Sequence, residues 1–547
     1  LTYNFRITQR GTYHLQAMGL GRNFRLRLED ANGWPLFNPE IDGDFTEAQE
    51  KSLLDDFGRL IRKEDDIARA DRLLWENKIT PVERMFGRIG DGQARLCKAR
   101  IALQENKKNA LKLLSKLSAE ERKHPGLLYD KMCFRARRDD DVREILLAAP
   151  KNLPYPEKWW KYRERAVREA MADGNIKLAE RLLSNHGQKE GQEFAQGFAD
   201  ASWLKGRLLL EYMKNHKEAY KVFSKMFSVV KYPVSKSRAA YWAAKAAQYA
   251  GDEEDAKKWL ETAAGYPTSF YGQIAFLIIN GEGSLYIPSP PAVDENERAE
   301  FNSRSIVRAV NLCISFGEVG LAGKLINHLV ADADSESEAL LASELGERAG
   351  ATYLSVRGAK KALQSNVALL DTGYPTPKTP DNLELPRELA LSIARQESEF
   401  NDMARSSAGA IGLMQLLPST AKEVAKKNDL PFNVGKLYEP EYNMTLGSIY
   451  LKKMIDNYSG SLVMAIAAYN AGPGNVYKWV QKFGRPSGGI DGVINWIENI
   501  PFAETRNYVQ RVLENLQIYR YMEARKNPNG ETPKLLLGKD LVGHEAN

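Results

Sequence analysis

The chain has 547 residues, of which 43% are hydrophobic and 27% are charged, and its formal net charge is +6. This length predicts about three domains, and the composition is that of an ordinary globular protein. No apolar run approaches the roughly 18 residues that a membrane span needs, and a charge this small without a recognised binding motif argues against nucleic-acid binding.

Residues 1–45 differ from the rest of the chain. They alternate apolar and polar residues, as at Tyr3, Phe5 and Ile7, and they contain a turn-forming Asn-Gly pair at Asn32–Gly33. Alternation of this kind is typical of β-strands. We predict a short β-prone or poorly ordered lead-in, whose role the sequence does not reveal.

Residues 46–290 carry apolar side chains at three- and four-residue spacing, as in 93–103, 110–117 and 177–183. This spacing predicts one amphipathic helix after another. Two stretches look alike, one beginning at Trp203 and the other at Trp242. Such repetition favours an α-superhelical domain built from degenerate helix–turn–helix repeats.

The same region is rich in tryptophan. Aromatic side chains can stack on sugars, but at helical spacing they are more often core residues. We therefore predict core positions for Trp159, Trp160, Trp203, Trp242 and Trp259.

Cysteine is sparse along the whole chain. The three cysteines form no CxxC pair, so a zinc site is not expected.

Two proline-rich joints divide the remainder of the chain. The first is Pro288–Pro291, and the second runs from Gly373 to Pro380. Proline-rich segments favour extended linkers. We therefore predict a smaller helical linker domain over residues 291–373, a C-terminal domain over residues 374–530, and a tail of residues 531–547.

The C-terminal domain contains neither histidine nor cysteine. Serine–histidine and cysteine–histidine catalysis cannot be built from this domain alone. Metal sites with imidazole or thiolate ligands are excluded there as well. Proton transfer must therefore use a carboxylate, a tyrosine or a lysine.

One carboxylate of this domain continues an apolar stripe. Leu389, Ile393 and Glu397 follow one another at every fourth position, so they share one face at the C-terminal end of a predicted helix. Burial and the negative end of the helix dipole both raise the pKa of a carboxyl group, which would suit Glu397 to general acid catalysis. An ion-paired or surface glutamate is the alternative. Glu388 and Glu399 point elsewhere and are expected in solvent.

Four short motifs, taken in order, resemble the soluble lytic transglycosylase family. They are Ala394-Arg-Gln-Glu-Ser398, Gly412-Leu-Met-Gln415, Ala468-Tyr-Asn-Ala-Gly472 and Glu504-Thr-Arg-Asn-Tyr508. Each motif alone is weak evidence, whereas four in this order within one domain are specific. The preceding helices, with Ser269-Phe-Tyr-Gly-Gln273 near their end, are similar to the superhelical domain of that family, and only residues 1–45 are left unexplained.

The resemblance implies a mostly α fold, in which an α-superhelix of helix–turn–helix repeats is followed by a lysozyme-like catalytic domain. It implies that Glu397 is the sole catalytic acid/base. Glu397 would protonate the oxygen of the MurNAc-β-1,4-GlcNAc bond in peptidoglycan and would then deprotonate the muramic C6 hydroxyl. That hydroxyl closes on C1 and leaves a 1,6-anhydro end, without water and without a cofactor.

The family's substrate-binding positions are carried over in the same way. Ser406 and Gln415 match positions that contact sugar or peptide groups. Tyr469 matches a tyrosine near the acid/base, whose hydroxyl would orient the carboxylate or the N-acetyl group. Met414 and Asn470 are expected to shape the cleft.

Two roles are open for Glu504. It is expected either to support the cleft or simply to cap its own helix.

Two alternative functions are left open. A hydrolytic muramidase of the same fold would need a second carboxylate to activate water, and the sequence does not exclude Asp402 for that role. A non-enzymatic helical-repeat scaffold with an inactive lysozyme-like domain is the third alternative, and the intact Glu397 argues against it.

The implied substrate also implies a location. Peptidoglycan lies outside the cytoplasm, so we expect a periplasmic protein, either free or attached to the outer membrane. Glycan strands are the expected partner. Cell-wall synthesis enzymes are further candidates that no residue specifically supports, and no nucleic acid or transmembrane segment is expected.

Overall fold

The computed structural model describes residues 45–59, 61–191, 195–290, 292–381, 383–526 and 533–543. These ranges contain 29 α-helices and isolated β-bridges but no β-strand, which confirms the expected mostly α class. No helix in them is both long and apolar enough to cross a membrane. The predicted lead-in, apart from Phe45, lies outside the described residues.

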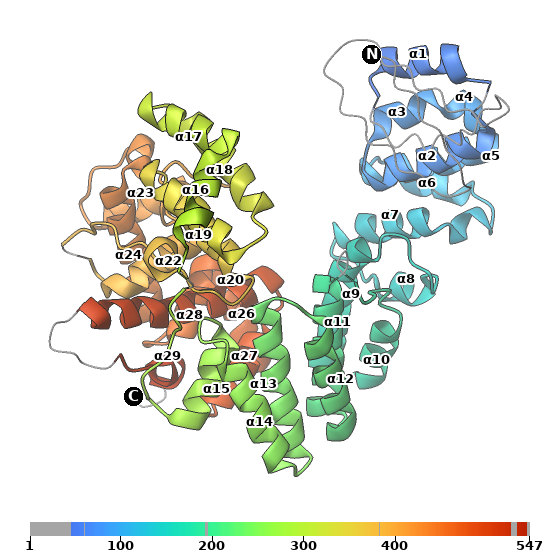
Figure 1. Cartoon of the computed structure of the whole chain (residues 1–547). Coiled ribbons are helices and arrows are strands. Elements are labelled where there is room, and N and C mark those ends of the chain that lie inside the picture. The colour runs from blue at the N-terminus through green and yellow to red at the C-terminus, as the bar shows by residue number, and fades with distance from the viewer. Residues whose placement is uncertain are drawn as a thin grey trace. The chain divides into compact units, whose positions relative to one another are not determined.

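The chain forms two compact units (Figure 1). The first contains the described residues up to Ala166 together with Ser184–Gly187, and the second contains Val167–Leu183 and the described residues from Gln188 onward. The five-part division made from the sequence stays a prediction.

The helices of the first unit follow the predicted apolar periodicity, and the expected helices at 93–103 and 110–117 are α5 and α6. Its hydrophobic core includes Leu73, Val82 and Ile101. In chain order the helices are α1 (Glu47–Phe57), α2 (Lys63–Trp75), α3 (Ile79–Arg84), α4 (Phe86–Ile89), α5 (Asp91–Gln104), α6 (Ala110–Ser115), α7 (Pro125–Ala136), α8 (Arg143–Ala148) and the first part of α9 (Pro156–Ala172).

The second unit begins with a stack of paired helices. They are α10 (Ile176–Ser184), α11 (Ala195–Arg207), α12 (His216–Val229), α13 (Pro233–Tyr249), α14 (Glu253–Ala264) and α15 (Phe270–Asn280), with a π-helical turn at Leu208–Tyr212 after α11. Trp203 and Trp242, the first residues of the two similar stretches, meet in the core with ring centroids 5.8 Å apart. Trp159 and Trp160 are also buried, as predicted, while Trp259 is half-buried.

A smaller group of helices follows, where a helical stretch was expected. It consists of α16 (Glu295–Ser303), α17 (Ser305–Ser315), α18 (Val319–Asp332), α19 (Glu336–Arg348), α20 (Thr352–Leu363) and α21 (Leu370–Gly373). The helices α19 and α20 are tightly joined, because the hydroxyl of Ser343 donates to the Ser355 carbonyl and the hydroxyl of Ser355 donates to the Ser343 carbonyl.

The last helices hold the predicted catalytic motifs. They are α22 (Arg387–Ser398), α23 (Pro418–Lys427), α24 (Pro440–Asn457), α25 (Leu462–Ala471), α26 (Pro473–Phe483), α27 (Gly489–Asn499), α28 (Ala503–Lys526) and α29 (Leu537–Val542). The long helix α28 packs against both α22 and α25, so it brings three of the four motifs together. The helix α29, within the predicted tail, packs against α27 and α15.

Candidate active site

Glu397 lies in the last turn of α22, and the predicted stripe below it is present. Leu389 and Ile393 are buried in the core, and the side chain of Glu397 is half-buried above them. The neighbouring Ser398 is buried, and its hydroxyl donates to the carbonyl of Leu413 at 2.7 Å. The second motif is thereby attached to the end of the helix that carries Glu397.

Burial raises the pKa of the Glu397 carboxyl to about 7. A hydrogen bond from the Tyr508 hydroxyl opposes this rise, and the negative charge of Glu504 adds to it. A carboxyl group with a pKa near 7 is populated in both protonation states at neutral pH, so it can donate a proton and later accept one.

Tyr508 contacts the carboxylate directly. Its hydroxyl donates to Oε1 of Glu397 at 2.6 Å, and its ring is buried on α28. Tyr508 closes the fourth motif but was not among the predicted site residues. The available signal was its position four residues after Glu504, which places both side chains on one face of α28.

Tyr469 and Asn470 lie at the C-terminal end of α25, as predicted. The charge of Glu397 contributes to the raised pKa of Tyr469, after burial, so the two side chains are close. The Tyr469 hydroxyl nevertheless donates to the carbonyl of Met414 at 2.7 Å, and it is Tyr508 that bonds the carboxylate. Asn470 accepts a hydrogen bond from the hydroxyl of Thr505, which ties α25 to α28.

The loop between α22 and α23 contains Ser406, Met414 and Gln415. The Ser406 hydroxyl oxygen accepts from the backbone N–H of Ala410, and the Gln415 amide donates to the carbonyls of Ala404 and Gly412. Met414 is fully buried. In this structure the polar groups of Ser406 and Gln415 therefore shape the loop.

The two other carboxylates named for the site are both exposed. Glu504 lies in the first turn of α28, and its charge raises the pKa of Glu397. Asp402 lies in the loop that follows α22. Of these two carboxylates, Glu504 is the one whose charge acts on Glu397.

The expectation that Glu399 lies in solvent is wrong. Glu399 accepts hydrogen bonds from Arg357 and Lys360, each at 2.7 Å, and its side chain is 21% exposed. Glu388 is half-buried as well, because α22 is covered along most of its length. Periodicity along one helix could not reveal cations supplied by α20.

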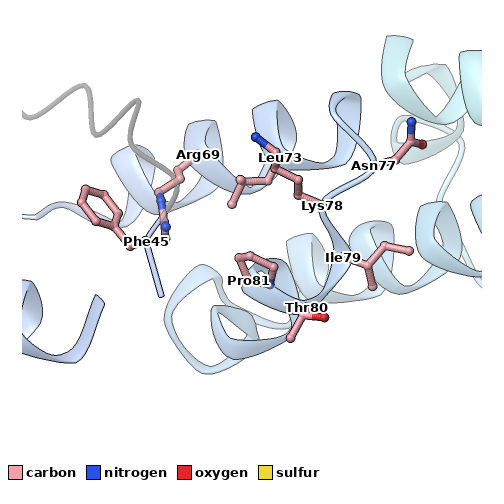
Figure 2. Close-up of a pocket in the computed structure, with 8 residues that line it drawn as sticks. All are labelled: Phe45, Arg69, Leu73, Asn77, Lys78, Ile79, Thr80 and Pro81. Atoms are coloured by element: carbon pink, nitrogen blue, oxygen red, sulfur yellow. The ribbon is translucent and has the colours of Figure 1, made fainter. Parts of the chain in front are cut away.

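A hollow of about 410 Å³ lies elsewhere, in the first unit (Figure 2). None of the predicted site residues lines it, and Arg69 within it is ion-paired with Glu50. Its lining residues are Phe45, Arg69, Leu73, Asn77, Lys78, Ile79, Thr80 and Pro81. Within the described ranges no group of three or more His, Cys, Asp or Glu side chains could hold a metal ion.

Two family models match the C-terminal part of the chain. Residues 378–488 match the transglycosylase SLT domain, and residues 499–527 match the soluble lytic transglycosylase helical domain. The first of these matches contains Glu397 and three of the four motifs, and the second contains Tyr508. The resemblance noted in the sequence is thereby confirmed.

Curated relatives match over part of their length. A relative from Haemophilus influenzae is 32% identical over 272 residues, which are 49% of this chain and 45% of that protein. The soluble lytic murein transglycosylase of Escherichia coli is 41% identical over 145 residues, which are 26% of this chain and 22% of that protein. The stretches aligned by sequence therefore span less than half the length of these relatives.

Solved structures match over most of the chain. An inactive mutant of a lytic transglycosylase from Pseudomonas aeruginosa superimposes with a TM-score of 0.60 at 22% identity, covering 91% of this chain and 84% of that one. The 70 kDa soluble lytic transglycosylase of Escherichia coli gives a TM-score of 0.55 at 20% identity, covering 92% and 84%. At these identities the likeness concerns the fold, and it confirms the expected fold class.

Proposed function

We propose that this chain, which carries a transglycosylase SLT domain over residues 378–488, is a peptidoglycan lytic transglycosylase. The observation that carries the proposal is the half-buried Glu397, whose pKa is raised to about 7 and whose carboxylate is held by Tyr508. One group that changes protonation state near neutral pH suits a reaction in which the same carboxyl is first acid and then base.

The proposed reaction cleaves the MurNAc-β-1,4-GlcNAc bond. Protonated Glu397 donates its proton to the glycosidic oxygen as the bond from C1 of the muramic residue to that oxygen breaks. The ionised carboxylate then takes the proton of the C6 hydroxyl, and the C6 oxygen forms a bond to C1. A 1,6-anhydro end results, Glu397 regains its proton, and no water is consumed.

The proposed scheme needs one carboxylate, whereas hydrolysis needs two. A two-carboxylate glycosidase needs a second carboxylate about 5–10 Å away that acts as nucleophile or activates water. Glu504 is exposed on the first turn of α28, and we infer that it tunes the pKa of Glu397 instead of activating water. Since the substrate is peptidoglycan, the proposed location is the periplasm.

The test is digestion of purified peptidoglycan sacculi, followed by mass spectrometry of the released muropeptides. We expect products with 1,6-anhydromuramic acid from the wild-type chain and none from Glu397→Gln. Glu388→Gln, a change on the same helix, serves as the matched control and should release the same products as the wild type.

Each other outcome contradicts the proposal in a different way. Reducing muropeptides would mean that water is the acceptor and that the chain is a muramidase, with Glu504 and Asp402 the carboxylates to examine. No release by a wild-type chain whose far-ultraviolet circular dichroism shows folded helices would support the scaffold alternative.

A further inference from the structure

The helix that carries Glu397 ends in an uncommon backbone conformation. The residue directly after α22, Glu399, has φ 55° and ψ 29°, and Phe400 has φ 65°, so two successive residues with side chains are left-handed. Helices often end on a left-handed residue, but that residue is usually glycine, because a β-carbon costs about 1 kcal/mol or more in this region. The side chain of Glu399 makes two charged hydrogen bonds that counter this cost.

That interaction is a pair of charged hydrogen bonds to α20. Oε2 of Glu399 accepts from Nε of Arg357, and Oε1 accepts from Nζ of Lys360, each at 2.7 Å. Arg357 also donates to Asn327 on α18. Burial alone would raise the pKa of Glu399, but Lys360 and Arg357 hold it below its ordinary value. We call Glu399, Arg357 and Lys360 the Glu399 clasp.

The clasp joins two well-anchored parts of the second unit. On one side, α20 is bonded to α19 through the buried pair Ser343 and Ser355. On the other side, Glu399 directly follows Ser398, whose hydroxyl is bonded to the Leu413 carbonyl. The end of α22 is therefore held by α20 and by the loop, two residues away from the carboxylate that Tyr508 contacts.

We propose that Glu399 is a positioning residue for Glu397, through which the helical group α16–α21 sets the orientation of the acid/base carboxylate towards Tyr508. This inference rests on the proposed catalytic role of Glu397. Glycine at this position would relieve the left-handed strain but would make neither bond to α20. The Glu399 side chain thus gives the end of α22 two direction-specific bonds to α20.

The decisive variant is Glu399→Gly in the full chain, because it removes the clasp and the strain together. We expect a melting temperature within about 3 °C of the wild type, since the relieved strain offsets much of the lost ion pairing. We expect kcat on glycan strands to fall about tenfold with KM unchanged, because misplacement of a reacting group lowers turnover. A wild-type kcat, or a change confined to KM, would overturn the proposal.

Two partner variants test the same bond from α20. Lys360→Met should lower kcat, whereas Lys360→Arg keeps a cation opposite Glu399 and should retain wild-type turnover. Glu399→Gln and Lys360→Met break the same interaction. The double variant should therefore lower kcat by a smaller factor than the two single factors multiplied together. Multiplicative effects would show that the two residues act independently and would contradict the clasp.

A second readout separates this inference from the proposed function. If the wild-type chain releases no product, the proposed function fails, but the pKa of Glu397 is still measurable by ¹³C NMR of labelled glutamate side chains, assigned with Glu397→Gln. The hydrogen bond from Tyr508 lowers the pKa of Glu397. Loss of the clasp should loosen this bond, so Glu399→Gly should raise the pKa of Glu397. An unchanged pKa would overturn the positioning role.

Discussion

Glu397 combines three influences of opposite sign at a single carboxyl group. Burial raises its pKa, the hydrogen bond from Tyr508 lowers it, and the charge of Glu504 raises it, with a net value of about 7. Tyr508 is buried whereas Glu504 is exposed, so solvent and salt weaken the effect of Glu504 far more. The operating pH of the proposed acid thus depends on two residues one turn apart on α28.

This balance predicts two shifts of opposite direction in the pH dependence of kcat/KM. The proposed acid must be protonated, so kcat/KM should fall as the pH rises past about 7. Tyr508→Phe removes the bond that stabilises the ionised form and should move this decline to higher pH. Glu504→Gln removes a negative charge and should move it to lower pH, by less, and only at low salt.

The measurement is turnover of isolated glycan strands over a pH series at low and high salt. The exposed Tyr477→Phe on α26 is the control for a lost tyrosine hydroxyl and should leave the profile unchanged. Shifts of the same sign for Tyr508→Phe and Glu504→Gln would contradict the assigned electrostatic roles.

At the scale of elements, α24 holds the loop between α22 and α23 in place through one buried amide. The Asn443 side chain donates to the carbonyls of Ile411 and Leu437 and accepts from the backbone N–H of Met414. Gly412 has φ 80°, and a β-carbon there would lie 2.3 Å from the Asn443 amide nitrogen. The glycine of the second motif is therefore required both by its backbone conformation and by this close approach.

Asn443→Ala should lower the free energy of unfolding by about 3 kcal/mol, because it leaves the Leu437 carbonyl and the Met414 N–H without a partner. The Ile411 carbonyl keeps its bond from the Leu416 N–H. Urea unfolding followed by tryptophan fluorescence would measure the loss. The exposed Asn428, which donates to the Val424 carbonyl, is the matched site, and Asn428→Ala should cost less than about 1 kcal/mol. Equal costs at the two sites would contradict the anchoring role of Asn443.

At the scale of the second unit, the buried Glu498 on α27 joins the helical stack to the helices that hold the four motifs. Its carboxylate accepts from Arg238 on α13, Tyr271 on α15 and Gln510 on α28, and its carbonyl accepts from Arg168 on α9. Burial alone would raise the pKa of Glu498, but Arg238, Arg506 and Arg168 lower it to about 2.

Because the pKa of Glu498 is lower in the folded chain than in the unfolded chain, its ionised form stabilises the fold above about pH 4.5. That stabilisation is lost as the pH falls through about 2. Glu498→Gln should therefore lower the free energy of unfolding by about 3 kcal/mol at neutral pH. The difference from the wild type should shrink between pH 4.5 and pH 2.

Urea unfolding of the wild type and of Glu498→Gln at neutral pH and at about pH 3 measures how far the cost of this substitution shrinks as the pH falls. Asp491→Asn is the control, because Asp491 pairs with Lys245 across the same two groups of helices. Asp491 is exposed, so loss of this ion pair should lower the free energy of unfolding by less than about 1 kcal/mol. A cost of Glu498→Gln that is the same at both pH values would contradict the role of its charge.

Local patterns were enough to predict the mostly α class, the tryptophan core and the helix that carries Glu397. These features depend on apolar spacing within single helices, which the chain displays directly. The four ordered motifs also indicated that α22, α25 and α28 contribute to one site. Glu397 was the residue for which periodicity and motif agreed.

The tertiary structure decided which side chains meet across helices that are far apart in the chain. Tyr508 and not Tyr469 bonds the carboxylate, and Glu399 meets cations from α20 instead of solvent. Asn443 and Glu498 lie outside the recognised motifs yet are buried at junctions between helices. Such contacts depend on how whole helices pack and rotate against one another, and the periodicity of one helix does not contain that information.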